Sequence, residues 1–95
     1  MDTDRLFDAG ERGTHLLFDR TAIQAAFRHD PAAFHDIVRR RISEIRATLR
    51  ALLDSEGIEA AQKLVAGLDA EVRDVLVVLY FDVLESRLRQ DALHH

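Results

Sequence analysis

The chain has 95 residues, no cysteine and a formal net charge of −4, and 47% of its residues are hydrophobic and 32% charged. This composition is typical of an ordinary globular domain, and the missing cysteines exclude disulfides, thiolate nucleophiles and cysteine-ligated metals. The mild negative charge argues against a protein whose main partner is a nucleic acid.

Residues 1–13 are expected to form a partly ordered N-terminal segment that contributes a single helical turn. This segment lacks the apolar stretch of a signal peptide. The longest apolar run, residues 75–81, is far shorter than the roughly 20 residues that span a bilayer. We therefore expect a cytoplasmic protein of one domain without a membrane segment.

Helix start signals divide the rest of the chain into helices. Asp30 before Pro31 is the pattern of an N-cap followed by a first-turn proline, and Asp69 is a second capping residue. Thr14 can cap a helix further upstream. The predicted helices span residues 15–28, 31–54, 58–66 and 70–91.

Gly57 and Gly67 are each followed by an apolar residue, which predicts glycines in the left-handed conformation at the ends of helices. The run VLVVLYF at residues 75–81 favours a strand by composition. Its flanks have helical spacing, however, and a lone strand would lack partners for its backbone groups. The sequence therefore predicts an all-α fold, a small helical bundle with two long and two shorter helices.

Two apolar stripes lie on the last predicted helix, about 140° apart at 100° per residue. One of them can be covered by helix 31–54. The other can be covered by the chain's own short helices, by a second copy of the chain, or by a different protein. The first stripe is Val72, Leu76, Leu79 and Val83, and the second is Val77, Phe81, Leu84 and Leu88.

We expect a second copy to cover the second stripe, because large apolar side chains left in water mark an association site. The sequence then predicts a non-catalytic protein–protein interaction module that forms a homodimer and acts as an adaptor or regulator of another protein. The predicted interface residues are Val77, Tyr80, Phe81, Leu84 and Leu88.

Arginines form a third pattern, on helix 31–54. Three of them line up beside its apolar face, with His35 at the N-terminal end. Nucleic-acid or other anion binding is one interpretation, since arginines along a helix can contact phosphates. Structural pairing with Asp74, Asp82 and Glu85, within the chain or across a dimer, is the preferred one. The candidate anion contacts are His35, Arg39, Arg46 and Arg50.

No catalytic, cofactor or metal site is predicted. The histidines lack the Glu-x-x-His spacing of a di-iron bundle, the serines lack an evident histidine base, and no glycine-rich phosphate loop is present. A small helical enzyme with an arginine-lined pocket at a dimer interface is a further alternative. That pocket would contain His35, Arg39, Arg46 and Tyr80.

Overall fold

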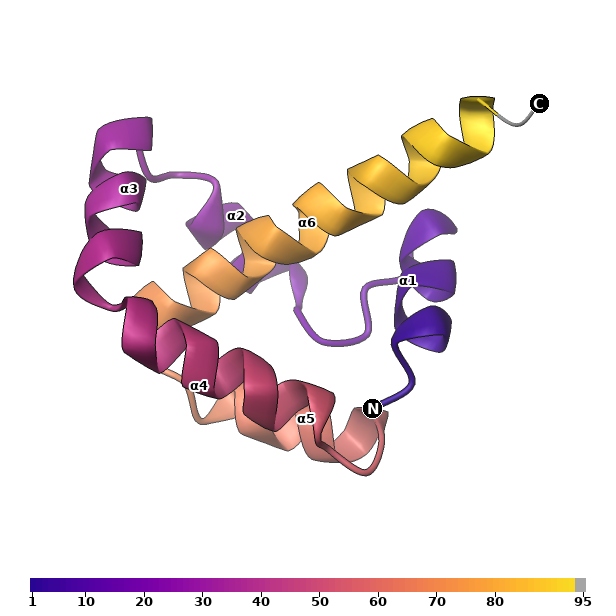
Figure 1. Cartoon of the computed structure of the whole chain (residues 1–95), viewed down its shortest axis with the longest axis horizontal. Coiled ribbons are helices and arrows are strands. Elements are labelled where there is room, and N and C mark those ends of the chain that lie inside the picture. The colour runs from indigo at the N-terminus through magenta and orange to yellow at the C-terminus, as the bar shows by residue number, and fades with distance from the viewer. Residues whose placement is uncertain (94–95) are drawn as a thin grey trace.

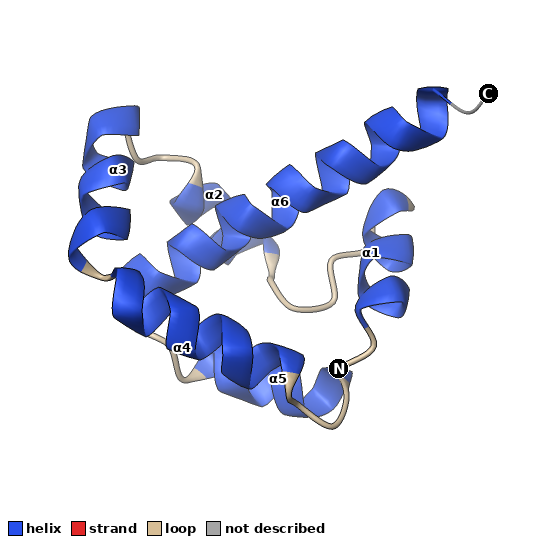
Figure 2. Ribbon diagram, in the orientation of Figure 1, coloured by secondary structure: helices blue, strands red, loops and turns tan. Residues whose placement is uncertain are grey.

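The computed structural model describes residues 1–93, and these form six helices and no strand (Figures 1 and 2). The predicted all-α class is confirmed, with six helices where we expected four. In chain order they are α1 (Thr3–Glu11), α2 (Arg20–Ala26), α3 (Pro31–Arg40), α4 (Ile42–Leu53), α5 (Ile58–Ala66) and α6 (Ala70–Leu93).

Helix α6 is the central element of the fold. Figure 1 shows it running diagonally across the molecule, with α1, α2, α3 and α4 placed around it. Val75 and Val77 lie on opposite sides of α6, and both are at most 1% exposed. The chain's own helices therefore cover α6 on both of these sides, which accounts for most of the run 75–81, whereas Leu79 stays 36% exposed. The main buried cluster is Leu6, Phe18, Ala22, Ala26, Leu52, Ala61, Val65, Val72, Leu76, Val77, Tyr80 and Leu84.

Aspartates cap four of the helices. Asp30 accepts a hydrogen bond from the Ala33 amide (2.8 Å) and Asp69 accepts one from the Val72 amide (3.1 Å), as predicted. The prediction for α2 is wrong, because Asp19 rather than Thr14 caps it. Residues 15–19 form an irregular segment instead of helix, and it places Phe18 in the core.

The predicted long helix over residues 31–54 is broken at Arg41, whose φ of −118° and ψ of 22° are not helical. The break lets α3 and α4 approach α6 from different sides. Ile37 of α3 and Ile45 of α4 both pack on Val75, in a small cluster of their own. In a straight helix these two residues would lie about 12 Å apart along the axis, so the break helps to bring both into one cluster.

The glycine prediction is also wrong. Gly57 has an extended backbone (φ −175°) at the N-cap of α5, and Gly67 has φ −90°. Within residues 1–93, Gly13 alone has positive φ, at 90°, directly after α1. Gly10 serves a different purpose, since a Cβ atom there would lie 2.3 Å from the Tyr80 hydroxyl oxygen. The missing side chain allows α1 to approach α6 closely.

Helix α1 is a nine-residue helix, longer than the single turn expected for the N-terminal segment. The guanidinium group of Arg87 on α6 donates a hydrogen bond to Asp8 (2.8 Å) and lies 3.6 Å from Glu11. It also lies 5.5 Å from the ring centroid of Phe7. These contacts fix α1 against the C-terminal half of α6, in addition to the buried Leu6.

Candidate association surface

Three of the five predicted interface residues are buried inside the chain. Val77, Tyr80 and Leu84 are 0%, 6% and 5% exposed, and all three belong to the main core cluster. Helices α1 and α2 both contact α6 and contribute Leu6, Ala22 and Ala26 to that cluster. These three residues therefore face the chain's own helices rather than a partner, because α1 and α2 reach further along α6 than the sequence indicated.

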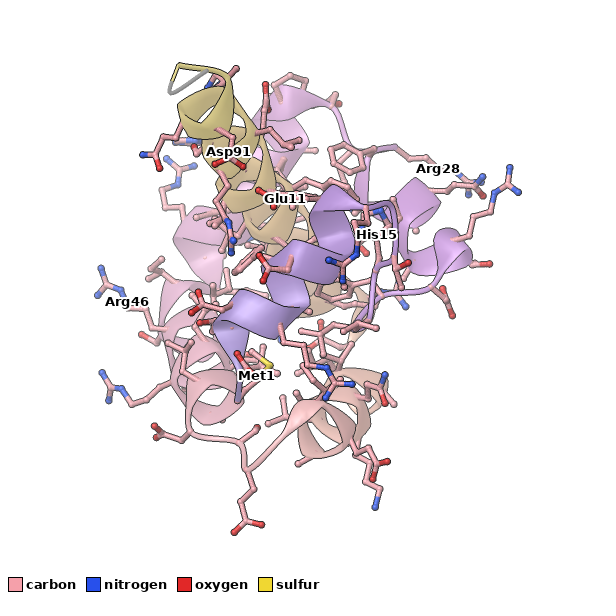
Figure 3. The ribbon with its side chains drawn as sticks, turned by 90° about the vertical axis from the view of Figure 1, so that its right-hand side faces the viewer. Met1, Glu11, His15, Arg28, Arg46 and Asp91 are labelled. Carbon is pink, nitrogen blue, oxygen red and sulfur yellow. The ribbon has the colours of Figure 1, made fainter. Side chains whose placement is uncertain are left out.

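Tyr80 is held from several directions. Its hydroxyl group shares a hydrogen bond of 2.8 Å with Nδ1 of His15, and its ring stacks on Phe7 at 5.5 Å between centroids. Burial raises the pKa of the phenol above its usual value. Figure 3 shows His15 behind α1, in the segment that leads to α2. Tyr80 is thus a structural residue that links α1, α6 and the connecting segment.

The remaining two predicted interface residues lie nearer the surface. Phe81 is half-buried, and its ring meets those of His15 (5.0 Å) and Phe27 (5.6 Å) edge to face. Leu88 is 48% exposed and lies near the C-terminal end of α6. Only these two residues of the second stripe are available to a partner.

A larger exposed apolar surface lies on the first stripe. An apolar cleft of about 240 Å³ opens between α1, α4 and α6, with Leu6, Leu52 and Leu76 among its lining residues. Leu53, Leu79 and Val83 also line it and are 58%, 36% and 45% exposed. We call the cleft together with these three side chains the apolar cleft surface.

Leu53 had no role in the sequence prediction. The signal that could have identified it is the pair Leu52-Leu53, because neighbouring helical residues point about 100° apart and cannot both face one core. Leu79 and Val83 were assigned to a stripe covered by helix 31–54. In the structure α4 covers Leu76 but leaves Leu79 and Val83 exposed.

The candidate anion contacts do not form one row. His35 and Arg39 are on α3 and Arg46 and Arg50 are on α4, so the break at Arg41 separates them. All four are exposed, and Figure 3 shows Arg46 pointing away from the molecule. Arg39 lies 3.5 Å from Asp36, whereas Arg46 and Arg50 form no ion pair with any described residue.

The predicted acidic partners of these arginines are engaged elsewhere in two of three cases. Glu85 pairs with Arg89 (3.3 Å) on the same helix. Asp74 is 4% exposed and lies between Nε2 of His29 (2.7 Å) and the guanidinium group of Arg73 (3.2 Å). Asp82 is exposed and has no ion pair within the described part of the chain.

The buried Asp74 cluster was not predicted. It joins the end of the α2–α3 connection, through His29, to α6. A carboxylate that is almost fully buried needs such partners, since an unpaired buried charge is strongly destabilising. The available signal for this burial was the position of Asp74 directly before the apolar run 75–81. A helical residue next to such a run is expected to lie close to the core.

Arg41 is the centre of an exposed ion-pair network at the break between α3 and α4. Its guanidinium group makes a bidentate pair with Asp69 (2.7 and 2.6 Å), pairs with Glu71 at 3.1 Å and also contacts Glu44. Arg40 pairs with Asp36 (2.8 Å) and Glu71 (3.1 Å). The network links the junction between α3 and α4 to the first turn of α6.

The pairing with Arg41 holds the pKa of Asp69 below its usual 3.8, helped by the amide of Val72. As the pH falls, the Asp69 carboxylate is therefore protonated at a higher pH in the unfolded chain than in the folded chain. The stabilisation from Asp69 is present above about pH 5 and is lost as the pH falls below 3.8 through the lower pKa of the folded state. Asparagine caps helices as well as aspartate does, so Asp69→Asn removes the charge while keeping the cap.

We expect the free energy of unfolding of the Asp69→Asn variant to lie below that of the wild type by a constant amount above about pH 5, and this difference to shrink below 3.8. Urea unfolding at a series of pH values measures it. Asp91→Asn is the control, since Asp91 is exposed and forms no ion pair with a described residue. A difference that stays constant down to the acid transition would contradict the assigned role of the Arg41–Asp69 pair.

Further cavities in the described part of the chain include one of about 510 Å³ beside His15, Phe18 and Phe81 and one of about 320 Å³ beside Leu17 and Gln62. His35, Arg39 and Arg46 line neither these cavities nor the apolar cleft, whereas Tyr80 lines the cleft. Among residues 1–93, no group of three or more histidine, aspartate or glutamate side chains is placed to hold a metal ion. None of the described helices is long and apolar enough to cross a membrane.

No protein-family model matches this chain, and neither a curated protein nor a solved structure matches it.

Proposed function

We propose that the protein is a non-catalytic helical interaction module that self-associates as a homodimer. The observation that carries this proposal is the apolar cleft surface, where Leu53, Leu79 and Val83 are exposed around a cleft lined by further apolar side chains. Exposed apolar patches with polar surroundings mark association sites in proteins that otherwise bury such side chains.

The total exposed surface supports the proposal. A folded monomer of 10.8 kDa exposes about 5500 Å² by the general relation between surface and mass. This chain exposes 6375 Å². The excess of roughly 800–900 Å² is similar to the area that one partner contributes to a standard protein–protein interface, about 800 Å².

The radius of gyration also supports self-association. A chain of this length typically folds to a radius of gyration of about 12 Å, and the value here is 13.5 Å. The projecting end of α6 contributes to this extended shape (Figure 1). A partner packed along α6 would bury surface that the five shorter helices leave uncovered.

The biological role that fits such a module is that of an adaptor or regulator of another protein. In that role the dimer would supply two identical copies of a binding surface. We place it in the cytoplasm on the sequence evidence alone.

Light scattering on a gel-filtration peak tests self-association directly. We expect a mass of about twice the 10.8 kDa chain at high protein concentration, falling toward the monomer on dilution. The measurement should span about 1–100 µM, because a micromolar dissociation constant is then resolved. A monomeric mass across this whole range would overturn the proposed function.

Nucleic-acid binding is the second candidate, and the observation that favours it is the pair of exposed arginines without an ion pair, Arg46 and Arg50. Binding through phosphate contacts would retard random duplex DNA at about 50 mM salt and collapse by about 150–200 mM. Absence of retardation at about 50 mM salt would remove this candidate. The arginine-lined enzyme pocket has no supporting observation, since His35, Arg39 and Arg46 line none of the cavities described above.

A further inference from the structure

Leu79 and Val83 form a short exposed ridge on α6. They are four residues apart, so their side chains follow one another along the same side of the helix. Leu76 and Tyr80, which line the apolar cleft, lie on the flank of α6 next to this ridge. A ridge and a groove therefore lie side by side on one face of the molecule, and helices pack by placing ridges into grooves.

This arrangement is self-complementary. If a two-fold axis runs roughly along the two helices, the ridge of each copy enters the cleft of the other, and the same residues are used on both sides. Helix α6 of one copy then lies between α6 and α4 of its partner. The flank of α6 that faces away from its own cleft comes to lie beside α4 of the partner.

The charges on these two flanks are opposite. Asp82 does not line the cleft, and on α6 it is turned about 60° from Leu79 and about 160° from Tyr80. Arg46, Arg50 and Leu53 share one side of α4, at i, i+4 and i+7 spacing, and Figure 3 shows Arg46 pointing away from the molecule. Neither Asp82 nor these arginines form an ion pair with any residue in the range 1–93.

We propose that a second copy of the chain occupies the apolar cleft, with Leu79 and Val83 of each copy in the cleft of the other and Asp82 facing Arg46 and Arg50 of the partner. This inference rests on the proposed self-association and specifies its interface. An acidic helix of another protein would match the arginines but not Asp82, whereas a second copy matches both.

The apolar part of the interface is tested with Leu79→Glu/Val83→Glu. Both positions are exposed in the single chain, so the variant is expected to keep its helical circular dichroism and to run as a monomer at concentrations where the wild type is dimeric. Leu88→Glu is the matched control, because Leu88 is 48% exposed on a different side of α6, outside the cleft. The control is expected to stay dimeric.

The charged part is tested with two reversals, Asp82→Arg and Arg46→Asp/Arg50→Asp. Each variant alone places like charges opposite each other in both halves of the dimer. We expect each to weaken dimerisation by about 10-fold or more, in a salt-dependent way. In an equimolar mixture the two variants restore opposite charges in both halves, so a heterodimer with wild-type affinity is expected.

The outcomes separate this inference from the proposed function. A wild-type dimer that persists in Leu79→Glu/Val83→Glu, or charge variants that fail to complement each other, would overturn the interface while self-association stands. A wild type that is monomeric throughout would overturn both. Loss of dimerisation in Leu88→Glu together with a dimeric Leu79→Glu/Val83→Glu would move the interface to the opposite side of α6.

Discussion

Replacement of Phe81 and Leu84 by glutamate is expected to unfold the protein. Leu84 is 5% exposed in the main core cluster, and Phe81 is half-buried between His15 and Phe27. The double variant loses about 1.5–3 kcal/mol of apolar burial at Leu84 and a part of that at Phe81, and it adds the cost of placing carboxylates among apolar groups. The sum is comparable with the whole stability of a domain of this size, about 5–14 kcal/mol.

Far-ultraviolet circular dichroism and urea titration measure this outcome. Leu79→Glu/Val83→Glu is the matched comparison, since it introduces the same two charges on the same helix at exposed positions and should leave the helical signal intact. A folded, monomeric Phe81→Glu/Leu84→Glu protein would contradict the structure. It would mean that the second stripe faces a partner, as the sequence analysis expected.

Removal of both partners of Asp74 is the second large effect. The variant His29→Ala/Arg73→Ala leaves a carboxylate with 6% side-chain exposure and no cation beside it. Breaking a buried ion pair in this way costs about 3–5 kcal/mol. For a chain of this length such a loss lowers the melting temperature by more than about 10 °C. Thermal unfolding followed by circular dichroism measures the shift.

A third substitution separates the charge from the loss of packing. Adding Asp74→Leu to the His29→Ala/Arg73→Ala variant removes the unpaired carboxylate, and replacing buried ionic groups by apolar ones is often neutral or stabilising. The triple variant is therefore expected to recover a large part of the lost stability. If the triple variant is less stable than the double variant, the unpaired charge is not the cause.

Local signals predicted the later half of the fold well. Gly57 separates α4 from α5, Gly67 and Asp69 separate α5 from α6, and α5 has the predicted bounds. Asp30 and Pro31 likewise predicted the start of α3. Such signals can be identified in the sequence because an N-cap and a first-turn proline act only on the next few residues. The break at Arg41 has no such signal. It arises from contacts with Asp69, Glu71 and α6, which are remote in sequence.

The candidate site was predicted less well, and the reason is again distance along the chain. The helical wheel predicted two apolar stripes on α6 but left the buried Val75 outside both of them. It also gave no information on how far each neighbouring helix extends. Gly10 lets α1 reach Tyr80 and Leu84, and Arg87 holds it there. As a result the second stripe is mostly covered, and the end of the first stripe, Leu79 and Val83, is left exposed.

The central position of α6 has a consequence for how the chain folds during translation. Residues 72–84, which fill the middle of the core, leave the ribosome after every helix that packs on them. Until then the nascent chain carries five helices of 7–12 residues, which are marginal on their own in water. Tertiary structure is therefore acquired in one late step, and a stalled or prematurely released product would offer its apolar faces to chaperones and proteases.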